Sequence, residues 1–387
     1  MEITDMIFQP PTLDGDSIGV LAKIDELKKR AGSVLSEPQR WMGILRRNML
    51  AKALRGSNTI EGYNVTADDA IAAVEGEEPL DADTATWAEI LGYRNAMTYV
   101  IQLAKDKTGA VSCDLIKSLH FMMLQHDLSK SPGQWRPGAI YVRREETGES
   151  VHEGPDASLV PELMTELCAT LNSESRDHLI VRGAMAHLNL TMIHPFRDGN
   201  GRMARCLQTL VLARGGHLAP VFVGIEEYLG GRKENTQEYY EILAGIGTGT
   251  WHPEHDALPW VRFCLKAHYR QINTVLNRME FIERLWNALE TEIRRQGLPE
   301  RTIMALADAA MRYRVRNPTY RKAADVSKVV AGRDLRSLVE HGLLRPHGEK
   351  RGRYYVASPA LTEIHRTIGA QRRHIEDPFG QLRLDLP

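Results

Sequence analysis

The sequence predicts a mainly α-helical protein that carries a few short β-hairpins. Apolar residues recur at helical spacing in several stretches, and the clearest of these runs from Leu159 to Leu171. Strand-like runs are few: residues 139–142 follow two Pro-Gly pairs, and residues 354–356 lie close to the C-terminus. This pattern favours a helical fold with small hairpins.

The chain divides into three expected domains. The first is an N-terminal helical region at 1–110, the second a central domain at 111–268 and the third a C-terminal domain at 280–375. Further helices are expected at 71–74, 179–193 and 203–212, and another begins at 258–260. No internal repeat is visible, and the tail 375–387 is polar.

Composition narrows the class of protein. The 387 residues are 43% apolar and 26% charged, which is typical of a globular domain. A net charge of -1 argues against a chain that binds nucleic acid over its whole surface. No run approaches the ~18–20 apolar residues of a membrane span, and the four cysteines form no CxxC pair. We therefore expect a cytoplasmic protein with reduced thiols and no membrane contact.

One segment combines residue types that suit phosphate chemistry. Residues 191–205 read TMIHPFRDGNGRMAR. The stretch 198–201 is a turn signal, because Gly199 and Gly201 can adopt positive φ values. One apolar helical stretch ends before this loop and another begins near Met203, so the loop is expected to open a helix. Backbone N–H groups at such a helix N-terminus bind anions.

Charged side chains around this loop indicate a nucleotide site. Arg202 and Arg205 are three residues apart and share one face of the first helical turn, where two guanidinium groups suit a di- or triphosphate. Asp198 would repel phosphates unless a cation lay between them, and the expected cation is Mg²⁺. His194 ends the preceding helix, and its ordinary pKa near ~6.5 suits a general base.

The segment from His194 to Arg205 also fits the pattern HxFx[DE]GNGRxxR at every specified position. A DGNG turn alone is common, and a single histidine near a helix end is more often structural. A chance match to the whole pattern in this length is on the order of 10⁻⁸. The segment resembles the active-site motif of the Fic family. The resemblance implies a helical core and transfer of AMP from ATP to Ser, Thr or Tyr hydroxyls of proteins.

The resemblance implies a role for each residue of the motif. His194 would deprotonate the target hydroxyl, and Asp198 would hold Mg²⁺. Arg202 would hold a phosphate oxygen, and Arg205 would hold the γ-phosphate. The α- and β-phosphates would be held by Gly199, Asn200 and Gly201. Catalysis would then depend on positioning and on neutralisation of charge.

A segment before the motif resembles the part of Fic proteins that holds the target. GQWRPGAIYVRR, at 133–144, resembles the flap hairpin that pairs with the target chain as a strand. The residues that would lie along the target are Ile140, Tyr141 and Val142.

A segment after the motif resembles the part of Fic proteins behind the nucleotide. EYLGGRKENTQEYYEIL, at 227–243, resembles a helix pair of the family, where Tyr239 and Tyr240 match positions near the nucleoside. Packing in the core explains these tyrosines equally well. An asparagine that is common one turn later in the family is Gly247 here.

An upstream segment resembles an inhibitory helix. Residues 56–66 read GSNTIEGYNVT, and the family pattern [ST]xxxE[GN] falls on Ser57, Glu61 and Gly62. The resemblance implies that Glu61 forms a bidentate pair with Arg205 and takes the place of the γ-phosphate. Taken alone the pattern is weak, since Ser and Glu four residues apart are common on helices and Gly62 could end a helix.

The C-terminal part carries local positive charge. Residues 301–356 contain 13 Lys or Arg and 5 Asp or Glu. A helix with Leu335 and Leu338 on its apolar face ends at Gly342, and a hairpin with a basic tip follows. This order resembles the winged helix that many Fic proteins carry, although a docking or dimerisation module with solvated charges is the rival interpretation. DNA would be contacted by Arg333, Arg336, Lys350, Arg351 and Arg353.

These features predict an autoinhibited protein adenylyltransferase that uses ATP and Mg²⁺. Its target would be another protein or the chain itself, and a homodimer is compatible with the sequence. One alternative keeps the fold but removes AMP or transfers another phosphate-containing group. A second alternative is a nucleotide-sensing, DNA-binding regulator. A metal site at 252–256 is not expected, because the two histidines lack a helical HExxH frame.

Overall fold

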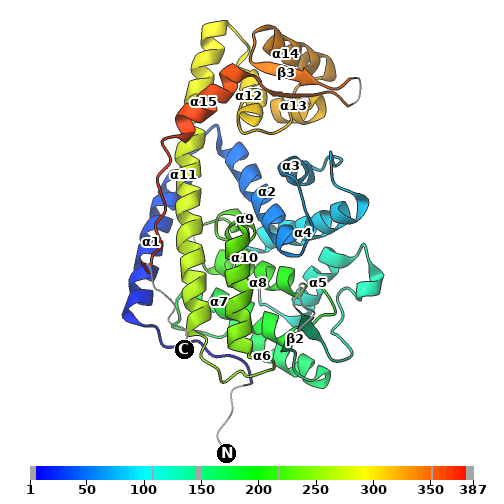
Figure 1. Ribbon diagram of the computed structural model, residues 1–387, viewed down its shortest axis with the longest axis vertical. Helices are drawn as coiled ribbons and strands as arrows, with labels where there is room; N and C mark the ends of the chain where they lie inside the picture. Colours follow the sequence, from blue (N-terminus) through cyan, green and yellow to red (C-terminus); the bar gives the residue numbers. More distant parts are fainter. Residues whose placement is uncertain (1–5, 107–108, 144–149, 217, 350–351, 381–387) are drawn as a thin grey trace, which may run out of the picture.

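A long helix, α11, joins two parts of the molecule in the computed structural model, which describes residues 6–106, 109–143, 150–216, 218–349 and 352–380 (Figure 1). α11 spans Leu258–Gln296 and extends from the large helical core at its start to a smaller C-terminal unit at its end. Pro259 lies in its first turn, and Gly297 ends it with a φ of 65°. α11 therefore runs through the stretch between the second and third expected domains.

The core is built from the helices that precede α11. α7 and α8 lie side by side at its centre, α2 packs on α9, and α1 packs along α11. Their bounds are α1 Gly15–Ser36, α2 Met42–Ile60, α3 Ala67–Glu75, α4 Thr84–Leu103, α5 Cys113–Leu124, α6 Val160–Asn172, α7 Leu179–Ile193, α8 Asn200–Gly215, α9 Glu226–Gly231 and α10 Lys233–Gly247. Single 3₁₀ turns occur at Leu128–Lys130 (η1), Ala157–Leu159 (η2), Pro220–Phe222 (η3) and Glu300–Thr302 (η4).

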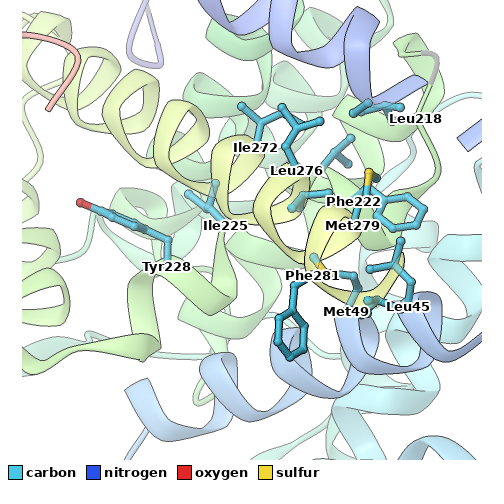
Figure 2. Close-up of a cluster of buried hydrophobic side chains, with 14 of the residues drawn as sticks. Leu45, Met49, Leu218, Phe222, Ile225, Tyr228, Ile272, Leu276, Met279 and Phe281 are labelled. Carbon is cyan, nitrogen blue, oxygen red and sulfur yellow. The ribbon is translucent and has the colours of Figure 1, made fainter. Parts of the chain in front are cut away.

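Apolar packing fixes α2 to the rest of the core. Figure 2 shows Leu45 and Met49 of α2 beside Leu276 and Met279 of α11. Each of these four side chains is at most 8% exposed. Burial of an aliphatic side chain of this size stabilises a fold by about 1.5–3 kcal/mol, so α2 is an integral helix of the core.

Close backbone approach adds to this packing of α2. A Cβ atom on Gly56 would lie 2.2 Å from the carbonyl oxygen of Glu226 in α9, and a Cβ on Gly230 would lie 2.2 Å from the carbonyl of Gly56. Only glycine permits this crossing of α2 and α9. The C-terminal half of α2, which carries Ser57, is therefore held against α9.

Two antiparallel hairpins interrupt the helices. β1 (Tyr141–Arg143) pairs with β2 (Ser150–Glu153), and β3 (Leu344–His347) pairs with β4 (Tyr354–Ala357). The second hairpin belongs to the C-terminal unit, which also contains α12 Ile303–Ala310, α13 Asn317–Ala324, α14 Lys328–Glu340 and α15 Pro359–Gly369. The unit is thus three helices followed by a hairpin and a closing helix.

The predicted secondary structure agrees with these elements except at a few ends. α7 has the expected bounds of 179–193, but α8 begins at Asn200 instead of near Met203. Gly199, with a φ of 75°, is the N-cap of α8, so the helix starts inside the predicted turn. The strand expected at 139–142 starts at Tyr141, because its pairing with β2 begins opposite Glu153.

The structure also bears on two expectations drawn from composition. All four cysteines are free thiols, although Cys113 Sγ lies 3.8 Å from Cys168 Sγ. In the part of the chain that the structure describes, no helix has the length and apolar character needed to cross a membrane.

Candidate active site

His194 is held at the C-terminal end of α7. Its φ of 51° ends the helix in the left-handed conformation, and its N–H donates to the carbonyl of Leu190 over 3.0 Å. The ring Nδ1 lies 3.0 Å from the carbonyl oxygen of Thr191, so Nδ1 carries the proton and Nε2 keeps a lone pair. Burial lowers the pKa of His194 to about 4. The imidazole is therefore neutral at pH 7 and ready to accept a proton.

The loop after His194 is fixed by side chains that bond its backbone. The amide of Asn200 bonds both the N–H and the carbonyl of Phe196, at 2.9 and 2.8 Å. The Phe196 ring stacks on His120, whose centroid lies 3.7 Å away. His120 accepts from the Gly133 N–H (2.8 Å) and donates to the carbonyl of Asp198 (2.9 Å). Because the Asn200 side chain is used in this way, only its backbone is free for a phosphate.

A buried arginine supports the same loop from the flap side. Arg136 is 4% exposed and donates from Nε to the carbonyl of His194 over 2.8 Å. It also donates from Nη1 to Gly138 (2.7 Å), and its backbone N–H reaches the carbonyl of Pro195 (2.9 Å). Arg136 therefore connects the base of the flap to the candidate catalytic histidine.

The N-terminus of α8 faces the site without a side-chain cap. Gly199 is the N-cap, and the first backbone bond of the helix runs from the N–H of Met203 to Gly199. The N–H groups of residues 200–202 therefore present a partial positive charge. Arg202 and Arg205 are each 1% exposed beside this turn. This concentration of buried positive charge is suited to an anion.

Glu61, the C-cap residue of α2, places a negative charge beside Arg205 and the N-terminus of α8. Its Oε1 lies 2.6 Å from Nη2 of Arg205, while Ser57 Oγ accepts from Nε of the same arginine over 2.9 Å. A Cβ atom on Gly201 would lie 2.6 Å from Glu61 Oε1, so this carboxylate lies against the first turn of α8. Burial alone would lower the pKa of Arg205, but Glu61 raises it above its ordinary value.

The geometry corrects one detail of the expected pair and explains Gly62. Glu61 contacts Arg205 through one oxygen and one nitrogen, whereas a bidentate contact was expected. Ser57 accepts from Nε at its hydroxyl and from Nη2 at its carbonyl, while Nη1 of Arg205 has no partner among the described residues. Gly62 has a φ of 83° and closes α2, so the helix-ending interpretation accounts for this glycine.

A second acidic residue, not predicted from the sequence, neutralises Arg202. Glu89 of α4 is 3% exposed and bonds Nη1 of Arg202 through one oxygen. Its other oxygen lies 2.7 Å from Nζ of Lys130. Burial would raise the pKa of Glu89, but Arg202 and Lys130 lower it to about 2. Each buried arginine of the motif therefore has its own carboxylate.

Asp198 fits the role of a metal ligand. Its Oδ1 accepts from the Gly199 N–H over 2.7 Å, and its Oδ2 lies 2.9 Å from Nζ of Lys130. Burial would raise the pKa of Asp198, but Lys130 lowers it below the ordinary value. The side chain is 39% exposed, and the ammonium group shows that this oxygen attracts a cation. Mg²⁺ could be held here by Asp198 and phosphate oxygens if Lys130 moved aside.

The two predicted nucleoside tyrosines have different surroundings. Tyr239 is 1% exposed and donates to His187 Nε2 over 3.0 Å, while His187 Nδ1 donates to Gln208 over 2.7 Å. The core-packing interpretation therefore accounts for Tyr239. Tyr240 is 46% exposed, and its hydroxyl donates to the carbonyl of Ile60 at the end of α2 over 3.2 Å.

The flap residues lie beside this site. Tyr141 is 48% exposed, Val142 is opposite His152 in β2, and the Ile140 carbonyl accepts from Gly154. Residues 144–149 lie outside the described part of the chain. The sheet order is β1-β2, so among the described residues one edge of β1 has no neighbouring strand.

His152 fills the space next to Gly247. Its Nε2 donates to the Met192 carbonyl over 2.8 Å, and its Nδ1 would lie 3.1 Å from a Cβ atom on Gly247. A larger residue at position 247 would therefore displace this histidine.

A group of histidines outside the motif also comes together. Ligand atoms of His252, Glu254 and His255 lie within 4.8 Å of one another. His252 already bonds Thr250 and Glu254, each at 2.9 Å, and His255 bonds the Ile246 carbonyl. Local hydrogen bonds account for the positions of these side chains.

The C-terminal arginines fall into two groups. Arg333, Arg336 and Arg353 are exposed, whereas Lys350 and Arg351 lie outside the described residues. Other basic residues form ion pairs: Arg301 with Asp334, Arg314 with Asp68 and Asp81, Arg316 with Glu77, and Lys322 with Glu75. Three of these basic residues, Arg314, Arg316 and Lys322, are thus neutralised by α3 and the segment that follows it.

The fold and the site define a helical domain in which a histidine-ended helix and a glycine-capped helix enclose two buried arginines. Residues 110–212, which contain α7 and most of α8, match the Fic/DOC family. This part of the chain is a Fic domain. The structure resembles that of a Fic family protein from Desulfovibrio desulfuricans, with a TM-score of 0.59, 24% identity and coverage of 91% of this chain and 99% of that one.

Curated relatives share the same region. The chain is 29% identical over 223 residues to a protein adenylyltransferase Fic from Nematostella vectensis, covering 57% of this chain and 47% of the relative. It is 32% identical over 191 residues to a protein adenylyltransferase Fic from Aedes aegypti, covering 49% of this chain and 34% of the relative. The chain thus spans between a third and a half of the length of these relatives.

Proposed function

We propose that this protein transfers AMP from ATP to a hydroxyl group of a protein side chain. One observation carries the proposal: a neutral histidine, two buried arginines and an uncapped helix N-terminus meet in one loop. The curated relatives, which are named protein adenylyltransferases, support this activity. Related reactions of the same fold, such as removal of AMP, would use the same groups.

The geometry suits in-line attack at the α-phosphate. The target hydroxyl would give its proton to Nε2 of His194, and its oxygen would bond to the α-phosphorus as the bond to the β-phosphate oxygen breaks. Pyrophosphate then leaves, with its charge balanced by Arg202, Arg205 and the first N–H groups of α8. Mg²⁺ at Asp198 would neutralise further phosphate charge. A neutral imidazole is required at the start, and the low pKa of His194 provides it.

We propose that Glu61 inhibits the protein. Its carboxylate lies 2.6 Å from Arg205 and against Gly201, where a phosphate of ATP would bind. A phosphate must therefore displace Glu61 or bind out of line. A hundredfold inhibition requires a bias of about 2.7 kcal/mol, which a partly buried, charge-assisted pair can supply.

Replacement of Glu61 tests both parts of this proposal. We expect Glu61→Gly to raise AMP transfer about a hundredfold by freeing Arg205. The measurement is incorporation of labelled AMP from ATP into lysate proteins and the chain itself, with mass spectrometry of labelled sites. Glu37→Gly is the matched control, because Glu37 is the exposed C-cap of α1 and contacts neither arginine. Equal labelling by the wild type and Glu61→Gly would contradict the inhibitory role.

We infer that the flap holds the target as an added strand. β1 has an unpaired edge among the described residues, and Tyr141 is exposed beside it. Main-chain hydrogen bonds to this edge would position an extended target segment with little demand on its sequence. Arg136 links the flap to His194, so a strand bound there would be aligned with the base.

We also propose that the C-terminal unit is a winged helix that binds DNA. Its order of three helices followed by a hairpin supports this assignment. Arg333 and Arg336 are exposed on α14, and Arg353 is exposed at the start of the returning strand. These side chains are free to contact phosphates, unlike the arginines that pair with α3.

A further inference from the structure

A large cavity lies on the side of α2 away from the motif. Its volume is about 650 Å³, within the ~300–1,000 Å³ that is usual for small-ligand pockets. The walls come from α2, α9, the start of α10, α11 and the C-terminal segment 372–375. No residue of the His194–Arg205 motif lines it.

The cavity is lined by an excess of positive charge. Seven of its lining residues are lysine or arginine, and one, Glu227, is acidic. The basic residues are Lys52, Arg55, Arg232, Arg270, Arg278, Arg372 and Arg373. Such a concentration of cations in a concave site attracts small anions.

Existing ion pairs balance only part of this charge. Glu227 binds Arg278 at 2.6 Å and lies 3.5 Å from Lys52. At the rim, Arg270 lies 3.7 Å from Asp377, and Arg373 lies 3.4 Å from Glu280. Within the described part of the chain, neither Arg232 nor Arg372 has a carboxylate within ion-pair distance.

The unbalanced cations repel one another. Burial lowers the pKa of Lys52, and Arg278 and Arg55 lower it further against the effect of Glu227. Burial and the charge of Arg278 also lower the pKa of Arg372. An anion placed among these groups would relieve the repulsion.

Two buried polar groups at the cavity lack a hydrogen-bond partner. Tyr228 is 9% exposed, and its hydroxyl is unpartnered among the described residues, as is Nε of Arg270. Figure 2 shows the Tyr228 hydroxyl pointing away from the apolar side chains labelled there. An unsatisfied buried donor costs about 1–3 kcal/mol, so a ligand whose acceptor oxygens reached these two atoms would remove that cost. A Cβ atom on the lining residue Gly231 would meet nothing within 4 Å, so there is open space for a ligand beside this residue.

We propose that this cavity binds a small anion with two or more linked phosphate groups, such as the polyphosphate chain of a nucleotide. Linked phosphates supply several charges and acceptor oxygens within one compact ligand, which suits cations that come from α2, from α11, from Arg232 between α9 and α10, and from the C-terminal segment. The site is independent of the proposed transferase reaction. Because Lys52 and Arg55 belong to α2, a bound ligand would also bridge this helix to α9 and α11.

Calorimetric titration of the full-length chain with inorganic tripolyphosphate tests the site. EDTA is present so that no divalent ion supports binding at the motif. We expect one site per chain, and at least tenfold weaker binding in the double variant Arg232→Gln with Arg372→Gln. The matched control is Lys29→Gln with Arg30→Gln, which removes two exposed charges on α1 and should change the affinity less than twofold.

A conservative variant separates ligand binding from folding. Tyr228→Phe removes only the unpartnered hydroxyl, so the thermal stability of the ligand-free protein should not fall. Its affinity for tripolyphosphate should fall about three- to tenfold, and ligand should raise its melting temperature less than that of the wild type.

Three outcomes would overturn the proposal. They are absence of binding by the wild type at millimolar tripolyphosphate, equal weakening in the control pair, and unchanged affinity in both cavity variants. Titration with ATP and AMP in EDTA identifies the source of the phosphates. Tighter binding of ATP than of tripolyphosphate would assign a nucleotide, and binding of AMP as tight as tripolyphosphate would contradict the need for linked phosphates.

Discussion

Two basic regions lie on different faces of α2, and they differ in how their charge is balanced. At the motif, Arg205 is matched by Glu61 and Arg202 by Glu89. At the cavity, Arg278 and Lys52 share Glu227, the single carboxylate among seven basic lining residues. The chain itself therefore supplies the anions at the motif, whereas the cavity depends on an anion from solution. Under the proposed function, the motif stays inhibited until Glu61 moves away from Arg205.

The largest effect is expected from removal of the proposed base, His194. Without a proton acceptor, the arginines and the helix N-terminus cannot support AMP transfer on their own. In the Glu61→Gly background, His194→Ala should lower AMP transfer by ~10²–10⁴-fold, the usual contribution of a general base. Labelled AMP incorporation measures the effect. Asn189→Ala on the same helix would be a poor control because it bonds Phe8, so the exposed Arg197→Ala is preferable.

The pH dependence of the same reaction tests the state of His194. Because burial places the pKa of His194 near 4, the imidazole is already neutral at pH 6. kcat/KM should therefore show no decline between pH 8 and pH 6 that belongs to this group. An acidic limb centred near pH 6.5 would show that the histidine titrates as it does in water.

The internal anion Glu89 gives a smaller but measurable effect on stability. Its pKa is depressed to about 2, so its contribution is complete above its unfolded value near 4.5 and is lost as the pH falls toward 2. Glu89→Gln should lower the free energy of unfolding by about 3 kcal/mol at pH 7. The variant should also lose most of the pH dependence between these values.

Chemical denaturation from pH 7 to pH 2.5 makes this measurement. Glu174→Gln, at an exposed position, is the control and should leave the curve unchanged. A Glu89→Gln curve parallel to that of the wild type would mean that Arg202 and Lys130 are neutralised by other groups.

The exposed arginines of the C-terminal unit should give the smallest effect on stability. Arg333→Gln with Arg336→Gln should change the unfolding free energy by less than about 0.5 kcal/mol, because both side chains are exposed and neither forms an ion pair with a described residue. If the unit binds DNA, the slope of log K against log salt should become shallower by ~0.9 for each DNA phosphate that the variant no longer neutralises. Fluorescence anisotropy with duplex DNA measures both affinity and slope.

Arg314, which forms ion pairs with the core, is the arginine to compare with Arg333 and Arg336. Arg314→Gln breaks the ion pairs with Asp68 and Asp81, so it should cost some stability and leave the salt slope unchanged. Loss of DNA binding through Arg314 instead of Arg333 would place the nucleic acid on a different face.

The sequence alone determined the local features of this protein. The 3.6-residue apolar period predicted α7 with its observed bounds, and the spacing from His194 to Arg205 predicted the loop that opens α8. Glu61 was matched with Arg205 through a family resemblance, and the two side chains do form a pair. These features are encoded by neighbouring residues or by a fixed pattern, so they can be recognised in a single chain.

Only the tertiary structure decided which distant groups complete the site. Glu89, His120 and Lys130 lie in no segment that the sequence singled out, and Arg136 had no assigned role within the flap segment, yet each of the four contacts the motif. The cavity likewise gathers cations from α2, α11 and the C-terminal segment, which lie far apart in the sequence. Electrostatic interactions depend on the distance between charges in space. Which charged side chains pair is therefore set by tertiary packing and cannot be read from their separation in the sequence.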